Sequence, residues 1–577
     1  MPLPDLTDQQ RELVLAEGNL FVEACPGAGK TRAIVARFLK RTEEETRKGI
    51  GLLSFTNAAI DEVRKRCAAR PDALLAPNFV GTFDSFINRF ITRPLYVRQY
   101  GQTPRFVESW QNISSASFRI GGMDRLPDLH LDWFEFDSSL RATLRVDWLT
   151  VRNQRTFSSL INSRRRVMEA RATTLCRDLV RRGTLSCAAS RAAAAGYLAD
   201  PGTYDLIGTL LAARFTEVIV DEAQDCGPEE LLVLSLLQQF GVTIVAVADL
   251  DQSIFEFRRA EPAAVRDFAD RLGASLPLDG NFRSSPAICA LNASLRHSHQ
   301  TETAVGENAA VSTPVQLVRF READLLAGRV ETLAASHGLI RKELIFLSHR
   351  GADARKHAGT AEPAISGNRV LGIAAAHAVL RSDSSTSRER LRAIETVERT
   401  VQAVIQDEDD RGSDAIDQHW LRDIAIRLAL DLDPFGLDPR AYAGKVREHL
   451  QKIAWPTGVT LSENLGSRIR APSAEEWQAS TEDPAAFAAA TIHSVKGREF
   501  PGVVVVLPAS LLKDDDSHHA VDHWERETAS EVRRVVYVGA SRAERLVVLA
   551  VHDSHLQRVI DLLIRDGVPH DVHEESS

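Results

Sequence analysis

Short apolar runs alternate along the first part of the chain with longer segments in which apolar residues follow helical spacing. The runs cover residues 20–22, 52–55, 79–81, 217–220 and 243–247. Runs of this length predict buried strands, and the segments between them predict helices. Such alternation is typical of a parallel sheet covered by helices.

A second alternating set of apolar runs occupies residues 315–320, 344–347, 503–507 and 546–551. A stretch of helical character interrupts each set. We therefore expect an α/β fold with two sheet domains, each carrying a mainly helical insertion. The expected ranges are 1–94 and 205–280 for the first domain, 95–204 for its insertion, 281–357 and 481–577 for the second domain, and 358–480 for a reduced insertion.

The composition is that of an ordinary globular protein, with 44% hydrophobic and 26% charged residues. The longest apolar runs are far shorter than the ~20 residues that span a bilayer, and no secretory signal is seen, so we expect a cytoplasmic protein without membrane association. The six cysteines form no C-x-x-C pair, which argues against a zinc or iron–sulfur site. His518, His519 and His523 lack regular ligand spacing and are predicted to lie in a polar loop. The net charge of −9 restricts any nucleic-acid site to a local groove.

A phosphate-binding loop is predicted where the first strand leads into a helix. The pattern G-x-x-x-x-G-K-[ST] is met there, with Ala in place of the first Gly. Glycines let backbone N–H groups close around phosphates, and the start of the helix favours an anion. Lys30 is expected to reach the β- and γ-phosphates of ATP, and Thr31 to hold Mg²⁺. The loop consists of Ala24, Cys25, Pro26, Gly27, Ala28, Gly29, Lys30 and Thr31.

Two carboxylates follow the apolar run at residues 217–220. Asp221 is expected to hold Mg²⁺ through its water shell, and Glu222 to orient and deprotonate the attacking water. Such a pair alone is often a helix N-cap. Together with the phosphate loop, it predicts ATP hydrolysis.

Further motifs occur in a fixed order around these two. They lie at residues 6–10, 53–59, 81–86, 248–258, 281–285, 491–500 and 537–543. With Asp-Glu-Ala-Gln-Asp at residues 221–225, this series resembles the UvrD/Rep family of superfamily 1 DNA helicases. The resemblance implies two RecA-like P-loop NTPase motor domains with ATP in the cleft between them.

The resemblance also implies which residues meet the adenosine part of ATP. Gln10 would read the base, and Phe282 would stack on it. Glu499 would meet the ribose or the γ-phosphate.

Three further residues are implied at the γ-phosphate. Gln252 would sense it, whereas Arg283 and Arg542 would act as cationic clamps on the transition state. Clamps of this kind can be worth ~10³–10⁵ in rate.

Single-stranded DNA, as the tail or fork of a duplex, is the implied partner. Aromatic side chains on such a track stack on bases, each worth ~1–3 kcal/mol. Family members commonly carry Tyr and Trp at the positions of Phe255 and Phe257, which predicts weaker binding of DNA by this chain. Asp84 stands where a His is common and places a carboxylate near the phosphate path. The implied DNA contacts are Phe55, Thr82, Phe255, Phe257, Arg258 and His493.

Two functions remain open at this point. One is an autonomous 3′-to-5′ DNA helicase in repair or recombination. The other is a DNA-stimulated ATPase or sensor that works with a partner nuclease in an anti-phage complex, since the helicase subunits of systems such as Gabija are similar small UvrD-like chains. Because only about thirty residues follow the last motif, we expect no nuclease domain in the chain itself.

Overall fold

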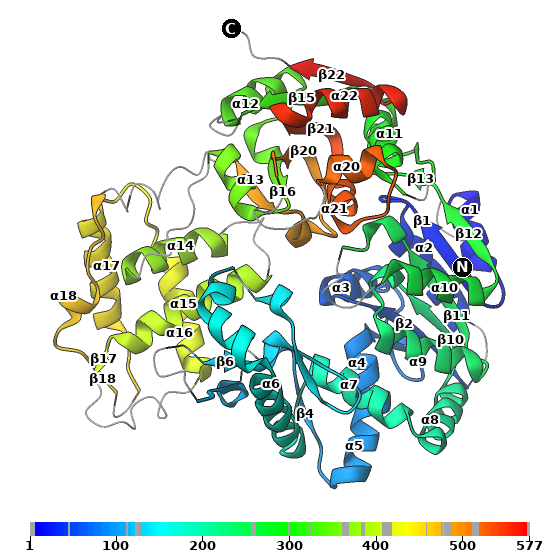
Figure 1. Cartoon of the computed structure of the whole chain (residues 1–577), viewed down its shortest axis with the longest axis horizontal. Coiled ribbons are helices and arrows are strands. Elements are labelled where there is room, and N and C mark those ends of the chain that lie inside the picture. Colours follow the sequence, from blue (N-terminus) through cyan, green and yellow to red (C-terminus); the bar gives the residue numbers. More distant parts are fainter. Residues whose placement is uncertain are drawn as a thin grey trace. The chain divides into compact units, whose positions relative to one another are not determined.

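The computed structural model divides into two compact units, residues 1–282 and 283–577, and each is described by itself. Figure 1 colours the chain from its N- to its C-terminus. The described residues are 6–43, 47–110, 113–121, 126, 128–149, 151–254, 261–297, 300–321, 326–359, 368–381, 387–406, 418–456, 459–474, 477, 487–510 and 519–573.

The first unit is built on a parallel sheet of six strands. Their order is β12-β1-β11-β10-β2-β3, so strands distant in sequence lie side by side. The carboxyl ends of all six therefore meet at one edge. The strands are β1 (Leu20–Ala24), β2 (Gly49–Ser54), β3 (Phe79–Thr82), β10 (Phe215–Val220), β11 (Thr243–Ala248) and β12 (Ser275–Leu278).

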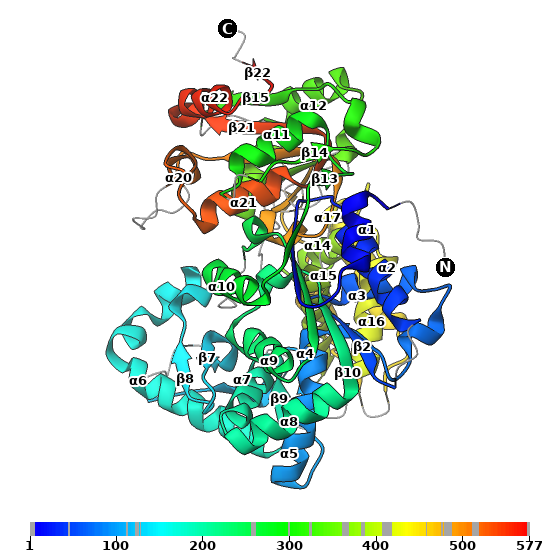
Figure 2. The same cartoon turned by 90° about the vertical axis from the view of Figure 1, so that its right-hand side faces the viewer.

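Helices cover both faces of this sheet because its strands are apolar on both sides. In β11, Val245 and Val247 belong to one hydrophobic cluster, and Ile244 and Ala246 to the other. Figure 2 shows α1, α2 and α3 on one side of the strands and α4, α9 and α10 on the other. The helices of the first cluster are α1 (Asp8–Leu15), α2 (Lys30–Thr42) and α3 (Asn57–Arg66); those of the second are α4 (Phe83–Ile87), α7 (Cys187–Leu198), α8 (Pro201–Arg214), α9 (Pro228–Gln239) and α10 (Pro262–Leu272).

The segment between β3 and α7 forms a separate hydrophobic core around the long helix α6 (Val151–Arg181). Helix α7 contributes side chains both to this core and to the sheet, through Ala192 and Leu198 respectively. Alongside α6 lie a π-helical turn (Asn88–Thr92), α5 (Arg93–Tyr100) and three two-stranded sheets: β4 (Arg105–Val107) with β9 (Thr184–Ser186), β5 (Ser117–Phe118) with β6 (Leu129–His130), and β7 (Phe134–Phe136) with β8 (Ala142–Leu144).

The second unit contains another parallel sheet of six strands, in the order β19-β16-β20-β21-β15-β22. Helices α12 and α13 pack on one hydrophobic cluster of this sheet, and α11 and α21 contact strand β21. The elements are α11 (Pro286–Leu295), β15 (Val315–Phe320), α12 (Ala327–Ser336), β16 (Leu344–Ser348), α13 (Gly351–Ala358), β19 (Ala488–Thr491), β20 (Phe500–Leu507), α20 (Ala520–Glu525), α21 (Glu531–Ala540), β21 (Ala543–His552), α22 (Leu556–Arg565) and β22 (His570–His573).

A helical bundle with its own core is inserted in the second unit. Val397 and Val401 of α15 are fully buried in it, as their helical spacing requires. The elements are α14 (Arg369–Arg381), α15 (Ser387–Ala403), α16 (Gln418–Asp431), α17 (Pro439–Lys452), α18 (Leu465–Arg468) and the pair β17 (Ile405–Gln406) and β18 (Thr460–Leu461). The predicted α/β class, with two helix-covered parallel sheets, is confirmed.

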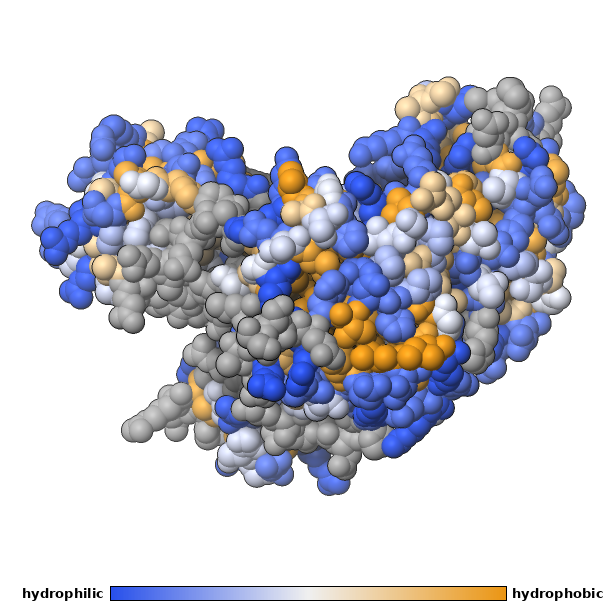
Figure 3. Space-filling model, turned by 90° about the horizontal axis from the view of Figure 1, so that it is seen from above, coloured by the Kyte–Doolittle hydropathy of each residue, from blue (hydrophilic) through white to orange (hydrophobic). Residues whose placement is uncertain are grey.

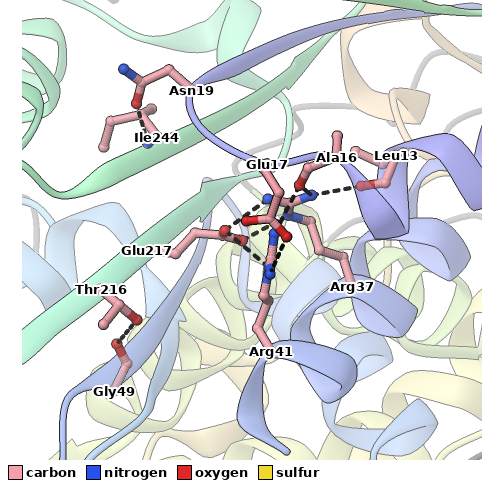
Figure 4. Close-up of polar contacts among 10 residues, drawn as sticks. All are labelled: Leu13, Ala16, Glu17, Asn19, Arg37, Arg41, Gly49, Thr216, Glu217 and Ile244. Carbon is pink, nitrogen blue, oxygen red and sulfur yellow. Dashed lines mark hydrogen bonds and ion pairs between the residues drawn. The ribbon is translucent and has the colours of Figure 1, made fainter. Parts of the chain in front are cut away.

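A buried ion cluster joins α1, α2 and β10 in the first unit (Figure 4). Nε and one terminal nitrogen of Arg37 each donate to a carboxylate oxygen of Glu217 at 2.7 Å. The other terminal nitrogen donates to the carbonyls of Leu13 and Ala16 at the end of α1. Arg41 lies 3.4 Å from the same carboxylate and pairs with Glu17 at 2.9 Å. The cluster thereby fastens α1 to the sheet.

On the face seen in Figure 3, hydrophilic residues predominate and the hydrophobic ones gather in separate patches. Among the described residues, no helix is both long enough and apolar enough to cross a membrane.

Candidate nucleotide-binding site and DNA-contact residues

The predicted phosphate loop connects the end of β1 to the start of α2. Gly27 and Gly29 adopt left-handed backbone conformations with φ of 70° and 69°, which a side chain would strain. The N–H of Cys25 donates to the carbonyl of Leu278, and the N–H of Phe282 donates to that of Gly27, both at 2.9 Å. Two backbone hydrogen bonds therefore connect the loop to residues 278–282, the end of β12 and the segment after it.

Gln10 is part of this loop's support. It is buried, and its amide nitrogen donates to the carbonyl of Ala28 at 2.8 Å. Its amide oxygen accepts the N–H of Thr7, completing a capping box at the start of α1. A Cβ at Gly29 would lie 2.7 Å from the Gln10 amide nitrogen and 3.9 Å from the Phe282 ring. Both predicted adenine contacts thus lie against the loop.

The predicted carboxylates lie at the carboxyl end of β10. Nζ of Lys30 is 3.8 Å from a carboxylate oxygen of Glu222. Burial acts to lower the pKa of Lys30, but the charges of Glu222, Asp249 and Asp221 outweigh it and the pKa lies above the ordinary value. Burial, followed by the neighbouring Glu222, raises the pKa of Asp221. The ammonium of Lys30 therefore lies close to Glu222 and within electrostatic reach of Asp249 and Asp221.

Glu222 itself has a left-handed backbone, with φ of 57° and ψ of 40°. For a residue with a Cβ this conformation costs roughly 1–2 kcal/mol, and such strain gathers at functional sites. The side chain of Gln224 bonds to the Glu222 carboxylate. The strained turn therefore holds Glu222 in one orientation.

Gln252 belongs to the same group through Asp249, a residue that sequence reasoning did not single out. The amide nitrogen of Gln252 donates to the Asp249 carboxylate at 2.8 Å, and the backbone N–H of Asp249 donates to Gln224 at 3.1 Å. Asp249 follows β11 directly, as Asp221 follows β10. That shared position at a strand end was the available signal.

The residues around the loop fit a magnesium nucleotide. Left-handed glycines, a helix start and Lys30 suit phosphates, and the hydroxyl of Thr31 with the carboxylate of Asp221 suits a hard cation. No group of three or more His, Cys, Asp or Glu that could hold a metal ion alone is found in the part of the chain that the structure describes.

Three predicted residues of the second unit lie together. Arg283 forms an ion pair with Glu499 and donates to the carbonyl of Ser541 at 2.9 Å. The next residue, Arg542, is buried, and its side chain donates to the carbonyl of Val538 and to the hydroxyl of Ser541. Both arginines therefore have fixed side chains within this unit.

The predicted DNA contacts are only partly described. Phe55 follows β2 and is half-buried, and the hydroxyl of Thr82 caps α4 by accepting the N–H of Ser85. In the second unit, the imidazole of His493 lies 5.5 Å from that of His349, centre to centre, and 4.0 Å from Glu531. Phe255, Phe257 and Arg258 fall outside the described residues.

Comparison with known proteins identifies relatives of this chain. Residues 6–272 match the family model of the UvrD/REP helicase N-terminal domain. The chain is 25% identical to DNA helicase II of Escherichia coli over 61% of its own length, 24% identical to ATP-dependent DNA helicase PcrA of Leuconostoc citreum over 51%, and 27% identical to ATP-dependent DNA helicase UvrD2 of Mycobacterium tuberculosis over 50%.

These matches cover 49%, 39% and 42% of the three relatives' own lengths, so the chain spans less than half of each. The family model and the relatives agree with the resemblance carried by the motifs, and that prediction is confirmed. The chain is therefore similar to the UvrD/Rep helicases, and its residues 6–272 match the UvrD/REP helicase N-terminal domain family.

Proposed function

We propose that this chain is an ATP-dependent DNA helicase that moves along single-stranded DNA in the 3′-to-5′ direction. The observation that carries the proposal is the group formed by Lys30, Glu222, Asp221 and Gln252 at the phosphate loop. The names of its relatives, DNA helicase II and ATP-dependent DNA helicase PcrA, support the choice of ATP and DNA.

Each residue of the group has a proposed task. The backbone N–H groups of the loop and Lys30 bind the phosphates, and Gln10 and Phe282 hold the adenine. Thr31 and Asp221 hold Mg²⁺, which when bound neutralises charge on the phosphates.

Glu222 accepts the proton of the attacking water, because its strained turn and Gln224 fix its carboxylate. Gln252, held by Asp249, responds to the γ-phosphate. The roles predicted for Arg283, Arg542 and Glu499 remain part of the proposal.

Substitution at the loop and at the base tests ATP hydrolysis. Glu222→Gln keeps the size of the side chain but removes the proton acceptor, so we expect turnover to fall at least about 10²-fold with single-stranded DNA present. Lys30→Ala should also abolish turnover, through loss of phosphate binding. Glu12→Gln, the same chemical change at an exposed site, should leave turnover unchanged. Wild-type turnover by Glu222→Gln would rule out the assignment.

DNA contacts are proposed at Phe55, Thr82, Phe255, Phe257, Arg258 and His493. An unwinding assay on duplexes with a 3′ or a 5′ tail tests direction and activity together. Unwinding from the 3′ tail alone supports the helicase. ATPase stimulated by DNA without unwinding would favour the alternative, a subunit working with a partner nuclease in an anti-phage complex. A place in repair or recombination, and in the cytoplasm, stays a prediction.

A further inference from the structure

A small cavity in the first unit lies beside Phe55, one of the proposed DNA contacts. Its free space of about 20 Å³ has room for one water-sized group. The walls combine two aromatic rings, three carboxylates and one guanidinium. The lining residues are Phe55, Phe83, Asp84, Arg191, Asp225 and Glu230.

The guanidinium in this wall, that of Arg191, already forms ion pairs with two of the carboxylates. Arg191 of α7 forms an ion pair with Asp84 of α4, and its Nε lies 3.5 Å from Glu230 of α9. Glu230 is buried and also accepts the N–H of Gly227 at 3.0 Å. These contacts leave the cavity richer in hydrogen-bond acceptors than in donors.

Asp84 is the acceptor best placed to meet a ligand. One third of its side chain is exposed, against 9% for Glu230. A carboxylate has about four acceptor positions, so the contacts of Asp84 with the Arg191 guanidinium and the Cys187 thiol leave capacity for another donor. Arg191 also fixes the orientation of Asp84 and offsets part of the negative charge of the wall, which lowers the electrostatic cost of bringing a polyanion nearby.

The aromatic part of the wall suits a nucleobase. The ring of Phe55 is half-buried, and its centre lies 5.6 Å from that of Phe83 at an angle of 31°. The solvent-accessible part of such a ring can stack on any base. A base on Phe55 could not enter 20 Å³ of free space, but an exocyclic group the size of water could.

We propose that this cavity is a base-reading subsite, in which a base lies against Phe55 and its exocyclic amino group donates a hydrogen bond to Asp84. The inference rests on the proposed function, since it requires DNA at Phe55. Cytosine presents an amino group at C4, where uracil and thymine present a carbonyl that a carboxylate repels. The motor should therefore hold cytosine more tightly than uracil or thymine at this subsite.

Binding of deoxycytidine and deoxyuridine homopolymers of equal length tests the inference, because these two bases differ only at C4 and at the neighbouring N3. At mildly alkaline pH and fixed salt, wild type should bind the cytosine strand about three- to tenfold more tightly. Asp84→Asn should reduce that ratio to one or below, because its amide can donate to the uracil carbonyl. Asp205→Asn, the same change at an exposed position of α8, should keep the wild-type ratio.

Comparing the ratio between proteins removes the contribution of self-stacking in the free strands. A second variant, Phe55→Leu, leaves the Asp84–Arg191 ion pair in place and should also lower the ratio, since the base loses its platform. Equal ratios in wild type and in folded Asp84→Asn would overturn the inference, as would wild-type preference for the uracil strand. Failure to bind either strand would instead overturn the proposed function, and the inference with it.

Discussion

The buried ion cluster of the first unit makes a quantitative prediction about stability. Arg37 is fully buried, the side chain of Glu217 is 5% exposed, and Arg41 shares the same carboxylate. Glu217→Ala would leave two arginines close together without their common partner. Removing one member of a buried pair costs about 3–5 kcal/mol, because the remaining charge keeps its desolvation penalty.

Thermal unfolding followed by calorimetry measures this effect. For a unit of this size, each kcal/mol lowers the melting temperature by about 1.7 °C, so Glu217→Ala should lower the transition of the first unit by at least about 5 °C. Glu17→Ala is the matched control, because Glu17 pairs with Arg41 of the same cluster but is 81% exposed. Its loss should cost less than about 1 kcal/mol.

Replacing both partners separates charge from packing. The double variant Arg37→Met with Glu217→Leu should recover much of the lost stability, because apolar side chains of similar volume carry no desolvation penalty. Nucleotide binding at low temperature should survive, since Glu217 lies about 13 Å along β10 from Asp221 at the rise of a strand. Equal melting temperatures for Glu217→Ala and Glu17→Ala would refute the reasoning.

Three further predictions concern the loop, its support and a buried histidine. Gly29→Ala should weaken ATP binding at least about tenfold, through the strained φ and the clash with Gln10, whereas Gly18→Ala, with φ of 77° and open space around it, should not; equal affinities in nucleotide titrations would contradict this. Gln10→Ala should lower affinity for both ATP and GTP, because the amide supports the loop, and for ATP by more; unchanged GTP affinity would deny the supporting role. Burial first, and then the stacked His555, lower the pKa of His519 to about 4. Below about pH 6.5 the unfolded chain therefore binds more protons at this histidine than the folded chain does. His519 contributes up to about 3 kcal/mol to the free energy of unfolding at neutral pH, and this contribution is lost as pH falls toward 4. His519→Asn keeps an acceptor for the N–H of Val521 and should flatten this decline in melting scans; an unchanged slope would count against it.

Local patterns in the sequence predicted the elements and the chemistry at their ends. Apolar runs predicted five strands of the first sheet and four of the second, but not the edge strands β12, β19 and β22, which lack a run of large apolar residues. The phosphate-loop pattern predicted Lys30, and the carboxylates after the run at residues 217–220 predicted Asp221. The order of the strands was not predictable, since β1 pairs with β11 and β12 from more than two hundred residues away. Such pairing depends on tertiary packing, which short-range periodicity does not report.

The contacts between side chains could not be predicted from the sequence either. Asp84 was predicted only as a carboxylate near the phosphate path. Its counter-charge is supplied by Arg191, 107 residues away in the chain. Gln10 was expected only as a reader of adenine, yet its amide nitrogen already holds the loop through Ala28. Contacts of this kind become visible only when the chain is folded.

The hydrogen bond between Phe282 and Gly27 has a mechanical consequence. Phe282 is the last residue of the first unit and is tied to its phosphate loop at 2.9 Å. Arg283, the next residue, is tied within the second unit to Glu499 and Ser541. Because Phe282 and Arg283 are consecutive, a shift of the phosphate loop that moves the backbone of Phe282 must also move the backbone of Arg283, through one planar peptide bond.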